Sequence, residues 1–351
     1  MSDILILEIP RGLTIGIDTF SLEVKAKQPI YGISKIPSGI HVIHFQHDEL
    51  RYGYWFTHGN FIIKWNTETE LYEMCEEKDL VKFENSLNDY ISRNLVLKYP
   101  SIDEWFRLIE YIDWVQVCHI MGGKEKEGAT VFYSDSSMST AEETEILRKR
   151  LKNSNDDDDK IFDYTTVRFK SREAIRSDHQ MEDFLDKSYY FNEIIMKKRF
   201  HGKISMYLGE LQFAYLNSIL FGNYGSSLQW HNLIELICGS SIVDTEYMSK
   251  LDSTLSVELK ILPIEYIDIL INDDMWIRSL NKSFQKERLP LTKREMQLKK
   301  PEFVNNSREG ESEEEEDPYD RSFLLQEEDD SEDEYKPTVV SGIYYERSRD
   351  V

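Results

Sequence analysis

Residues 8–45 contain the stretch that decides the fold: EIPRGLTIGIDTFSLEV, a basic connector, and then YGISKIPSGIHVIHF. It holds two Ile-Pro-x-Gly quartets, at 9–12 and 36–39. Each quartet predicts a tight reversal, because Pro presets φ at one turn position and Gly accepts a positive φ at another. Apolar segments rich in β-branched residues flank both quartets, at 4–7, 13–17, 31–33 and 40–45. The pattern predicts a β-domain of short strands at the start of the chain.

Aromatic segments extend this β-domain. Tyr52–Phe56 and Phe61–Trp65 are separated by the four residues 57–60, which include a Gly, and this arrangement predicts a hairpin. Leu71–Met74 is a further strand candidate.

A helical period follows the strands. Apolar residues between Leu80 and Ile91 recur at helical spacing, and Pro100 closes that segment. The tetrapeptides 101–104 and 140–143 have the pattern of capping boxes, each of which predicts a helix start. Behind the first box, one helix is predicted from a single apolar stripe: Trp105, Leu108, Ile109, Ile112 and Val115. We expect these helices to pack on the β-domain.

The run NSNDDDD at 153–159 interrupts regular structure, because adjacent carboxylates repel and bury nothing. We therefore place an acidic linker at 153–160, after a β-rich N-terminal domain at 1–152. Residues 161–170 are a possible returning strand of that domain.

The segment 171–300 is predicted to be an all-α domain. Helical patterns run from Phe184 to Ile194 and end by Gly202, and from Ile204 to Ile219 with an end at Gly222. Further patterns follow at 230–237, with an end near Gly239, and at 255–262 and 267–271. Together they predict an antiparallel bundle or short solenoid of five to seven helices in a chain of α+β class.

Residues 301–351 form an acidic tail that we expect to be disordered. This tail has 18 acidic and five basic residues, so it carries 13 of the 23 net negative charges of the 351-residue chain. Within it, 337–345 (PTVVSGIYY) has a strand-like pattern with three possible fates: pairing with a partner's sheet, folding back on its own body, or staying disordered. The candidate partner-binding residues in this segment are Val339, Val340, Ile343, Tyr344 and Tyr345.

The acidic balance argues against direct binding to nucleic acid, where phosphate contacts need a basic surface. It favours a protein partner with a basic face. The three cysteines, Cys75, Cys118 and Cys238, are far apart and predict neither a disulfide framework nor a zinc site. No signal peptide and no membrane span is predicted, so we expect an intracellular monomer.

No pattern predicts catalysis, a metal or a cofactor. His41, His44 and His47 have the spacing of a helical metal site, but they lie in a predicted strand, where His44 points away from the other two. The Gly122-Gly123-Lys124 sequence lacks the upstream Gly and the following Ser/Thr of a phosphate-binding loop.

Several hydroxyl groups are candidates for phosphorylation. Ser253 and Thr254 belong to a cluster with Ser249 and Ser256 that we place between two helices, where they serve either as helix caps or as a phosphorylation switch. Ser312 and Ser331 precede carboxylates in the tail and suit an acidophilic kinase.

The sequence resembles the A1-cistron splicing factor family, assembly factors of the U5 snRNP, in its fungal branch. The resemblance lies in IPRGLTIGID, FSLEV, GISKIPSGIHVIHF and GYWF, and in the helical half in LGELQFAYLNSILFGN, QW and LIELICGS. It covers roughly residues 4–120 and 160–290.

The resemblance implies a non-catalytic assembly chaperone that acts in the cytoplasm and nucleus and is required for pre-mRNA splicing. The implied partner is the large U5 snRNP scaffold protein, pre-mRNA-processing splicing factor 8, through its RNase-H-like and MPN-type domains. By holding this scaffold, the chain would block premature helicase and RNA binding. The alternative function is a generic cytosolic adaptor whose helical domain forms a peptide-binding groove.

Overall fold

The computed structural model describes residues 1–7, 13–23, 30–47, 50–75, 86–93, 95–100, 103–122, 128–150, 161–282, 284 and 287–301. The acidic linker, the first Ile-Pro-x-Gly quartet and the tail from residue 302 lie outside the described residues. Everything described falls in one compact unit, 1–307.

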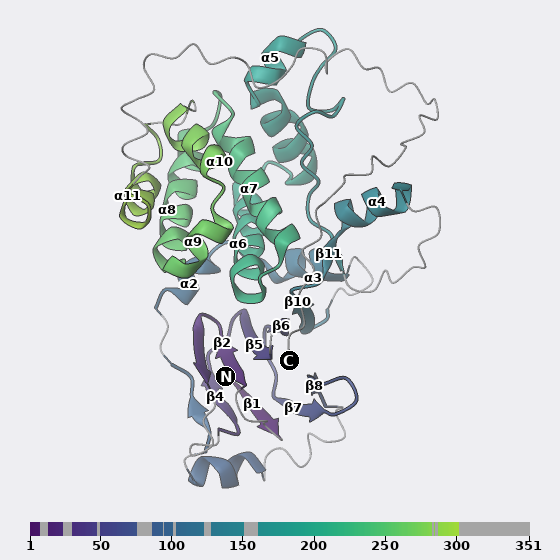
Figure 1. Ribbon diagram of the computed structural model, residues 1–351, viewed down its shortest axis with the longest axis vertical. Coiled ribbons are helices and arrows are strands. Elements are labelled where there is room, and N and C mark those ends of the chain that lie inside the picture. The colour runs from purple at the N-terminus through teal and green to yellow at the C-terminus, as the bar shows by residue number, and fades with distance from the viewer. Residues whose placement is uncertain are drawn as a thin grey trace, which may run out of the picture. The chain divides into compact units, whose positions relative to one another are not determined.

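The N-terminal half is built from two five-stranded sheets (Figure 1). The first sheet has the order β8-β7-β1-β4-β9, and the second has the order β10-β6-β5-β2-β3. The strands of the first sheet are β1 (Ser2–Leu7), β4 (Gly32–Ile36), β7 (Phe61–Asn66), β8 (Leu71–Met74) and β9 (Leu97–Lys98). Those of the second are β2 (Thr14–Ile17), β3 (Phe20–Glu23), β5 (His41–His47), β6 (Leu50–Phe56) and β10 (Val131–Asp135).

The predicted strands are confirmed, but the predicted hairpin across residues 57–60 is wrong. β6 belongs to the second sheet and β7 to the first, where β7 runs parallel to β1. The second quartet, 36–39, also carries the chain from one sheet to the other, because it joins β4 to β5. The two strands joined by each of these loops therefore face each other across the core between the sheets. They are not hydrogen-bonded neighbours within one sheet.

That core lies between the two sheets. It contains the side chains that point inward from alternate positions along the strands, among them Ile4, Ile15 and Ile43. Phe45 stacks on Tyr72 with ring centroids 4.7 Å apart, and the Tyr52 hydroxyl accepts a hydrogen bond of 2.7 Å from the Tyr72 backbone N–H. The aromatic segments therefore add large side chains to a core that is otherwise built from isoleucine and leucine.

The opposite face of the second sheet packs on the helices. Val42, Trp55 and Phe132 belong to the same apolar cluster as the helical residues. The Trp55 indole Nε1 donates a 3.1 Å hydrogen bond to Oδ1 of Asn217 on α6, and both side chains are buried. The second sheet is thus covered on both sides.

The helical elements have the following bounds: α2 (Trp105–Leu108), α3 (Trp114–Gly122), α4 (Ala141–Arg150), α5 (Gln180–Leu185), the π-helix η2 (Tyr190–Arg199), α6 (Ile204–Phe221), α7 (Tyr224–Cys238), α8 (Thr245–Ile261), α9 (Ile264–Leu270), α10 (Asp273–Ile277), the π-helical η3 (Arg278–Lys282) and α11 (Pro290–Lys299). Residues 86–92 are also helical. Among the described helices, none has both the length and the hydropathy to cross a bilayer.

The predicted ends of the two central helices are confirmed. α6 ends at Gly222, which has a φ of 68°, a left-handed conformation that glycine adopts without strain. Asn223 caps α7 by accepting a hydrogen bond from the Ser226 N–H, and Gly239 follows the last turn of α7.

Two helices predicted as continuous are each divided. The stripe from Trp105 to Val115 is split between α2 and α3, and Val115 is exposed. The Gln212 side chain of α6 accepts from the Tyr111 N–H and donates to the Arg107 carbonyl, which satisfies backbone groups at the break. A tertiary contact therefore replaces the helical hydrogen bonds there.

The helical pattern from Phe184 to Ile194 is likewise divided, between α5 and η2.

The predicted returning strand is short. β12 (Ile161–Phe162) pairs in parallel with β11 (Ser139–Thr140), and residues 163–169 are not in a sheet. The predicted capping box at Thr140 is confirmed, because Glu143 N–H donates to the Thr140 hydroxyl and Thr140 N–H donates to the Glu143 carboxylate.

A buried carboxylate fastens the segment after β12 to the helices. Glu210 on α6 accepts hydrogen bonds from the Thr165 N–H (2.8 Å), the Thr165 hydroxyl (3.0 Å) and the Gln229 side chain (2.8 Å). Burial raises the pKa of Glu210 from 4.5 to about 7, and these hydrogen bonds only partly oppose the effect.

This raised pKa predicts a pH dependence of stability. Between pH 4.5 and 7 the folded chain retains a proton on Glu210 that the unfolded chain releases, so this group lowers the free energy of unfolding as the pH rises. Glu210→Gln removes the titration, so its stability relative to wild type should rise by roughly 2 kcal/mol from pH 5 to pH 7.5. Urea denaturation at both pH values measures this, with the exposed Glu265→Gln as control. A difference that does not vary with pH would contradict the assignment.

Candidate protein-binding surface

The structure describes two of the predicted phosphorylation sites. Ser253 and Thr254 lie inside α8, so their predicted position between two helices is wrong. Thr254 is buried and its hydroxyl donates to the Lys250 carbonyl, whereas Ser253 is half-buried. Ser312, Ser331 and the predicted partner-binding residues Val339, Val340, Ile343, Tyr344 and Tyr345 lie outside the described residues.

Ser253 lies beside a helix cap. The preceding residue, Asp252, is buried and accepts hydrogen bonds from the backbone N–H groups of Leu291 and Thr292 in the first turn of α11. It also accepts from the Thr292 hydroxyl at 2.7 Å. A phosphate on Ser253 would thus place negative charge next in sequence to Asp252, whose carboxylate already caps the N-terminus of α11.

The histidines of β5 have structural contacts. His41 Nδ1 lies 2.8 Å from the Asp18 carboxylate, and His44 Nε2 lies 3.0 Å from the Asp18 carbonyl oxygen. Tyr99 donates to the same Asp18 carboxylate at 2.6 Å. Within the ranges described, no three His, Cys, Asp or Glu side chains are grouped as a metal would need.

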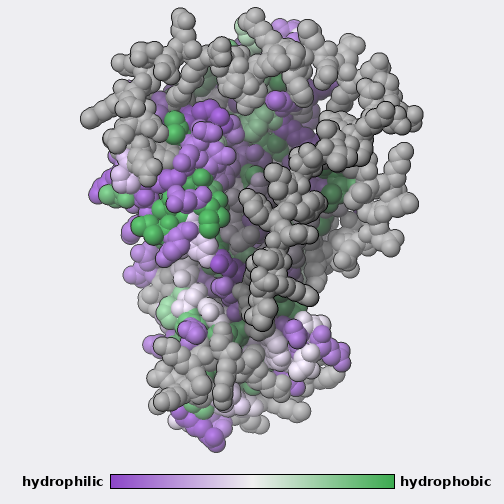
Figure 2. Space-filling model, in the orientation of Figure 1, coloured by the Kyte–Doolittle hydropathy of each residue, from purple (hydrophilic) through white to green (hydrophobic). Residues whose placement is uncertain are grey.

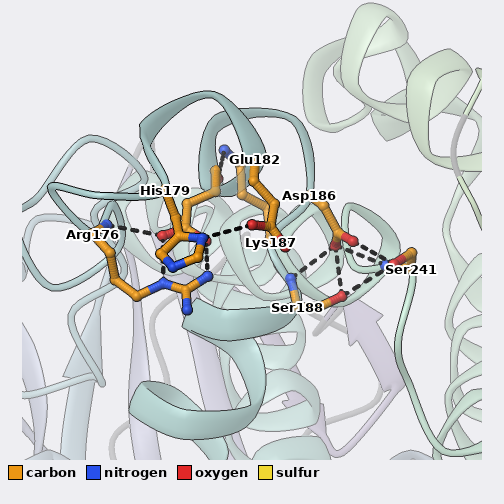
Figure 3. Close-up of polar contacts among 8 residues, drawn as sticks. Arg176, His179, Glu182, Asp186, Lys187, Ser188 and Ser241 are labelled. Atoms are coloured by element: carbon orange, nitrogen blue, oxygen red, sulfur yellow. Dashed lines mark hydrogen bonds and ion pairs between the residues drawn. The ribbon is translucent and has the colours of Figure 1, made fainter.

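A dense set of polar contacts shapes the surface around α5 (Figure 3). The Arg176 guanidinium donates two hydrogen bonds to the Asp183 carboxylate, from Nε at 2.9 Å and from an Nη at 2.7 Å. The Arg176 backbone N–H donates to the same carboxylate. These contacts with Arg176 hold the pKa of Asp183 below its usual value, although burial acts in the opposite direction. The pair fixes the segment before α5 to the helix itself.

Asp186 makes the second half of this network. Its carboxylate accepts from the side chains and backbone N–H groups of Ser188 and Ser241. Burial favours a higher pKa for Asp186, but the bonds from Ser188 and Ser241 outweigh it and hold that pKa below 3.8. Asp186 therefore joins the end of α5 to the loop between α7 and α8, as Figure 3 shows.

The elements held by this network present apolar side chains to solvent. Met181 and Leu185 lie four residues apart on α5, on one face, and are 75% and 67% exposed. Ile242, next to Ser241, is 72% exposed, and its backbone is bonded at both ends, by the Ser188 hydroxyl and the Asn192 side chain. We call Met181, Leu185 and Ile242 the α5 surface.

The α5 surface has the features of a pre-organised docking site. Exposed apolar groups on an ordered backbone gain contact area on binding without a large loss of conformational entropy. The same helix, α5, carries exposed polar side chains such as Glu182, which resembles the polar rim of protein interfaces. The sequence did not predict this surface. The apolar spacing of Met181 and Leu185 was a possible signal, but the contribution of Ile242 depends on a contact between distant segments.

Comparison with known proteins places the chain in a family. The family model described as "AAR2 N-terminal domain" matches residues 2–122, and the one described as "AAR2 C-terminal repeat region" matches residues 164–308. The chain belongs to the AAR2 family. The first match spans both large sheets except β10, and the second spans α5 to α11.

Relatives are found in fungi and vertebrates. The chain is 44% identical to A1 cistron-splicing factor AAR2 of Saccharomyces cerevisiae, over 96% of this chain and 97% of the relative. It is 22% identical to the protein AAR2 homologs of Homo sapiens and Mus musculus, over 79% of this chain and 80% of each relative. The predicted resemblance to the fungal branch of the A1-cistron splicing factors is thereby confirmed.

The polar network of this AAR2 protein predicts a stability effect. Arg176→Ala leaves the buried Asp183 carboxylate without its charged partner, and the free energy of unfolding should fall by about 2 kcal/mol. Arg172→Ala removes an exposed arginine from the same segment and should change stability by about 0.5 kcal/mol at most. Urea denaturation compares the two variants. Equal effects would show that the pair does not hold this segment.

Proposed function

We propose that this protein is a splicing factor that assists assembly of the U5 snRNP without catalysing a reaction. The observation that carries this proposal is the relationship to the yeast A1 cistron-splicing factor, which extends along nearly the whole of both chains. The vertebrate relatives are related over about four-fifths of their length. Family models match both halves of the chain, and this agrees with a shared function that depends on both halves.

The proposed partner is the large U5 snRNP scaffold protein, bound through its RNase-H-like and MPN-type domains. By occupying these domains, the chain would keep the helicase and RNA away until assembly is complete. Assembly is proposed to begin in the cytoplasm and to end in the nucleus. The charge of the chain supports this role. A protein with a net charge of −23 is repelled by RNA but attracted to a basic RNA-binding face on a protein.

Two parts of the chain are proposed to make the contact. The α5 surface offers ordered apolar side chains on the folded body, and the segment 337–345 offers an extended strand for a sheet edge. Phosphorylation of Ser253 is proposed as a release signal, since added charge there would disturb the cap that Asp252 provides to α11.

Truncation tests the tail. The full chain and a variant ending at Lys336 are titrated by calorimetry with the isolated MPN-type and RNase-H-like domains. We expect the truncation to weaken binding to the MPN-type domain more strongly than binding to the RNase-H-like domain. Equal loss for both domains, or no loss, would contradict the proposal. Absence of any binding by the full chain would favour the alternative of a general adaptor with a peptide-binding groove.

A surface variant tests the body. Leu185→Asp places a charge on the α5 surface and should weaken binding to the scaffold by about tenfold or more, because a desolvated carboxylate is costly in an interface. Its unfolding midpoint should not change, because the side chain is two-thirds exposed. Leu298→Asp on α11 is the matched control, with a side chain that is 66% exposed. Equal affinities of the two variants would exclude the α5 surface.

A further inference from the structure

A cleft of about 180 Å³ lies between the second sheet and the helices. Polar residues of the sheet line one side, among them Thr14, Gln46 and Arg51. Apolar residues at the end of α6 and around the start of α9 line the other side: Ile219, Leu220, Ile261, Pro263 and Tyr266.

The alternation of side chains along the strands explains this polar wall. Ile43 and Phe45 of β5 point into the core between the sheets, so His44 and Gln46 point toward the helices. On the same helix-facing side, Val42 and Trp55 pack into the helical core. Further along the same strands, the polar residues leave a gap instead of a packed contact.

His44 contributes no positive charge to the cleft at neutral pH. Its ring lies directly over Gly16, where an added Cβ would come within 1.9 Å of it. Burial, helped by the nearby positive charge of Arg51, lowers the pKa of His44 to about 4, although the hydrogen bond to the Asp18 backbone acts in the opposite direction. The neutral ring donates from Nε2 to the Asp18 carbonyl oxygen. Of the lining residues that the structure describes, Arg51 is therefore the charged one.

Arg51 is half-buried and has no carboxylate partner among the described residues. Its guanidinium lies over the Tyr266 ring, 5.1 Å from the centroid, and the cleft lining contains no Asp or Glu from the part of the chain that the structure describes. Other arginines of the same protein form ion pairs, including Arg93 with Asp89 and Arg278 with Glu235. Among the described residues, a half-buried guanidinium that faces no carboxylate has unused hydrogen-bond donors.

The rim of the cleft adds apolar surface. α9, which contributes Tyr266 to the lining, also carries Ile264 and Ile269, which are 69% and 81% exposed. Figure 2 shows a hydrophobic patch over α9. A ligand that engages Arg51 can therefore bury apolar groups on the same element.

We propose that this cleft binds an acidic segment of a partner protein, in which an Asp or Glu carboxylate pairs with Arg51 and flanking apolar residues contact α9. Charge complementarity supports a carboxylate, since a planar guanidinium stacked on an aromatic ring presents a fork that matches it. The apolar half of the lining supports a peptide over a free ion. A phosphate group would ordinarily be held by several cations or backbone N–H groups, and this lining offers one guanidinium.

NMR titration of the full chain, labelled with ¹⁵N, tests the proposal through the Nε–Hε resonance of Arg51, which is assigned by its loss in Arg51→Gln. The probes are the capped peptide acetyl-Leu-Glu-Leu-amide, its Leu-Gln-Leu counterpart and inorganic phosphate. We expect a saturable shift with the glutamate peptide, and about tenfold weaker binding of the glutamine peptide. Arg51→Gln should weaken binding of the glutamate peptide to the same extent, as followed by backbone amides of Thr14 and Ser21.

Arg93→Gln is the control for loss of one positive charge, and its affinity for the glutamate peptide should equal that of wild type. If Arg51→Gln does not fold, the comparison of the two peptides on the wild-type chain still shows whether the cleft prefers a carboxylate. Equal binding of both peptides, or no shift with any probe, would overturn the proposal. A shift with phosphate but not with the glutamate peptide would overturn it in favour of a phosphorylated ligand.

Discussion

Burial of the second sheet on both faces is the constraint on which the rest of the structure depends. One face packs on the first sheet through residues such as Ile43 and Phe45, and the other packs on the helices through Val42 and Trp55. Because a strand alternates its side chains, β5 and β6 must supply apolar groups to two different cores. The hydrogen bond from Trp55 to Asn217 joins the indole to α6 without leaving a buried donor unpaired. The N-terminal and helical halves therefore belong to a single compact unit.

Polar side chains decide where the helices stop. Gln212 satisfies the backbone between α2 and α3, Asn223 caps α7 and also donates to the Met138 carbonyl, and Asp252 caps α11. Asp186 serves the same purpose between α5 and the loop after α7. Each of these groups is bonded to a segment distant in sequence. A buried polar group that is fully satisfied fixes one arrangement of the backbone, because any other leaves it unpaired.

The polar network around α5 keeps exposed apolar side chains on ordered backbone. The carboxylates of Asp183 and Asp186 tie α5 and the loop at Ile242 to the body, so that the exposed residues stand on ordered backbone. The cleft at Arg51 differs from the α5 surface in kind, because it combines one cation with an apolar wall. The two proposed binding surfaces would therefore have different chemical preferences, one for apolar groups and one for an acid.

The strands, the central helices and their glycine ends could be predicted from the sequence, because local patterns such as alternation in 41–47 and the spacing from Ile204 to Ile219 carry that information. Family membership could also be predicted, because motif order is a property of the chain itself. The sheet to which each strand belongs was decided only by the tertiary structure: β6 and β7 look like a hairpin locally, but β7 pairs with β1 far away in sequence. The breaks at 109–113 and 186–189, the α5 surface and the position of Arg51 over Tyr266 likewise depend on contacts between distant segments. Local propensity sets the type of each element, whereas burial and hydrogen-bond satisfaction across the whole chain select which elements meet.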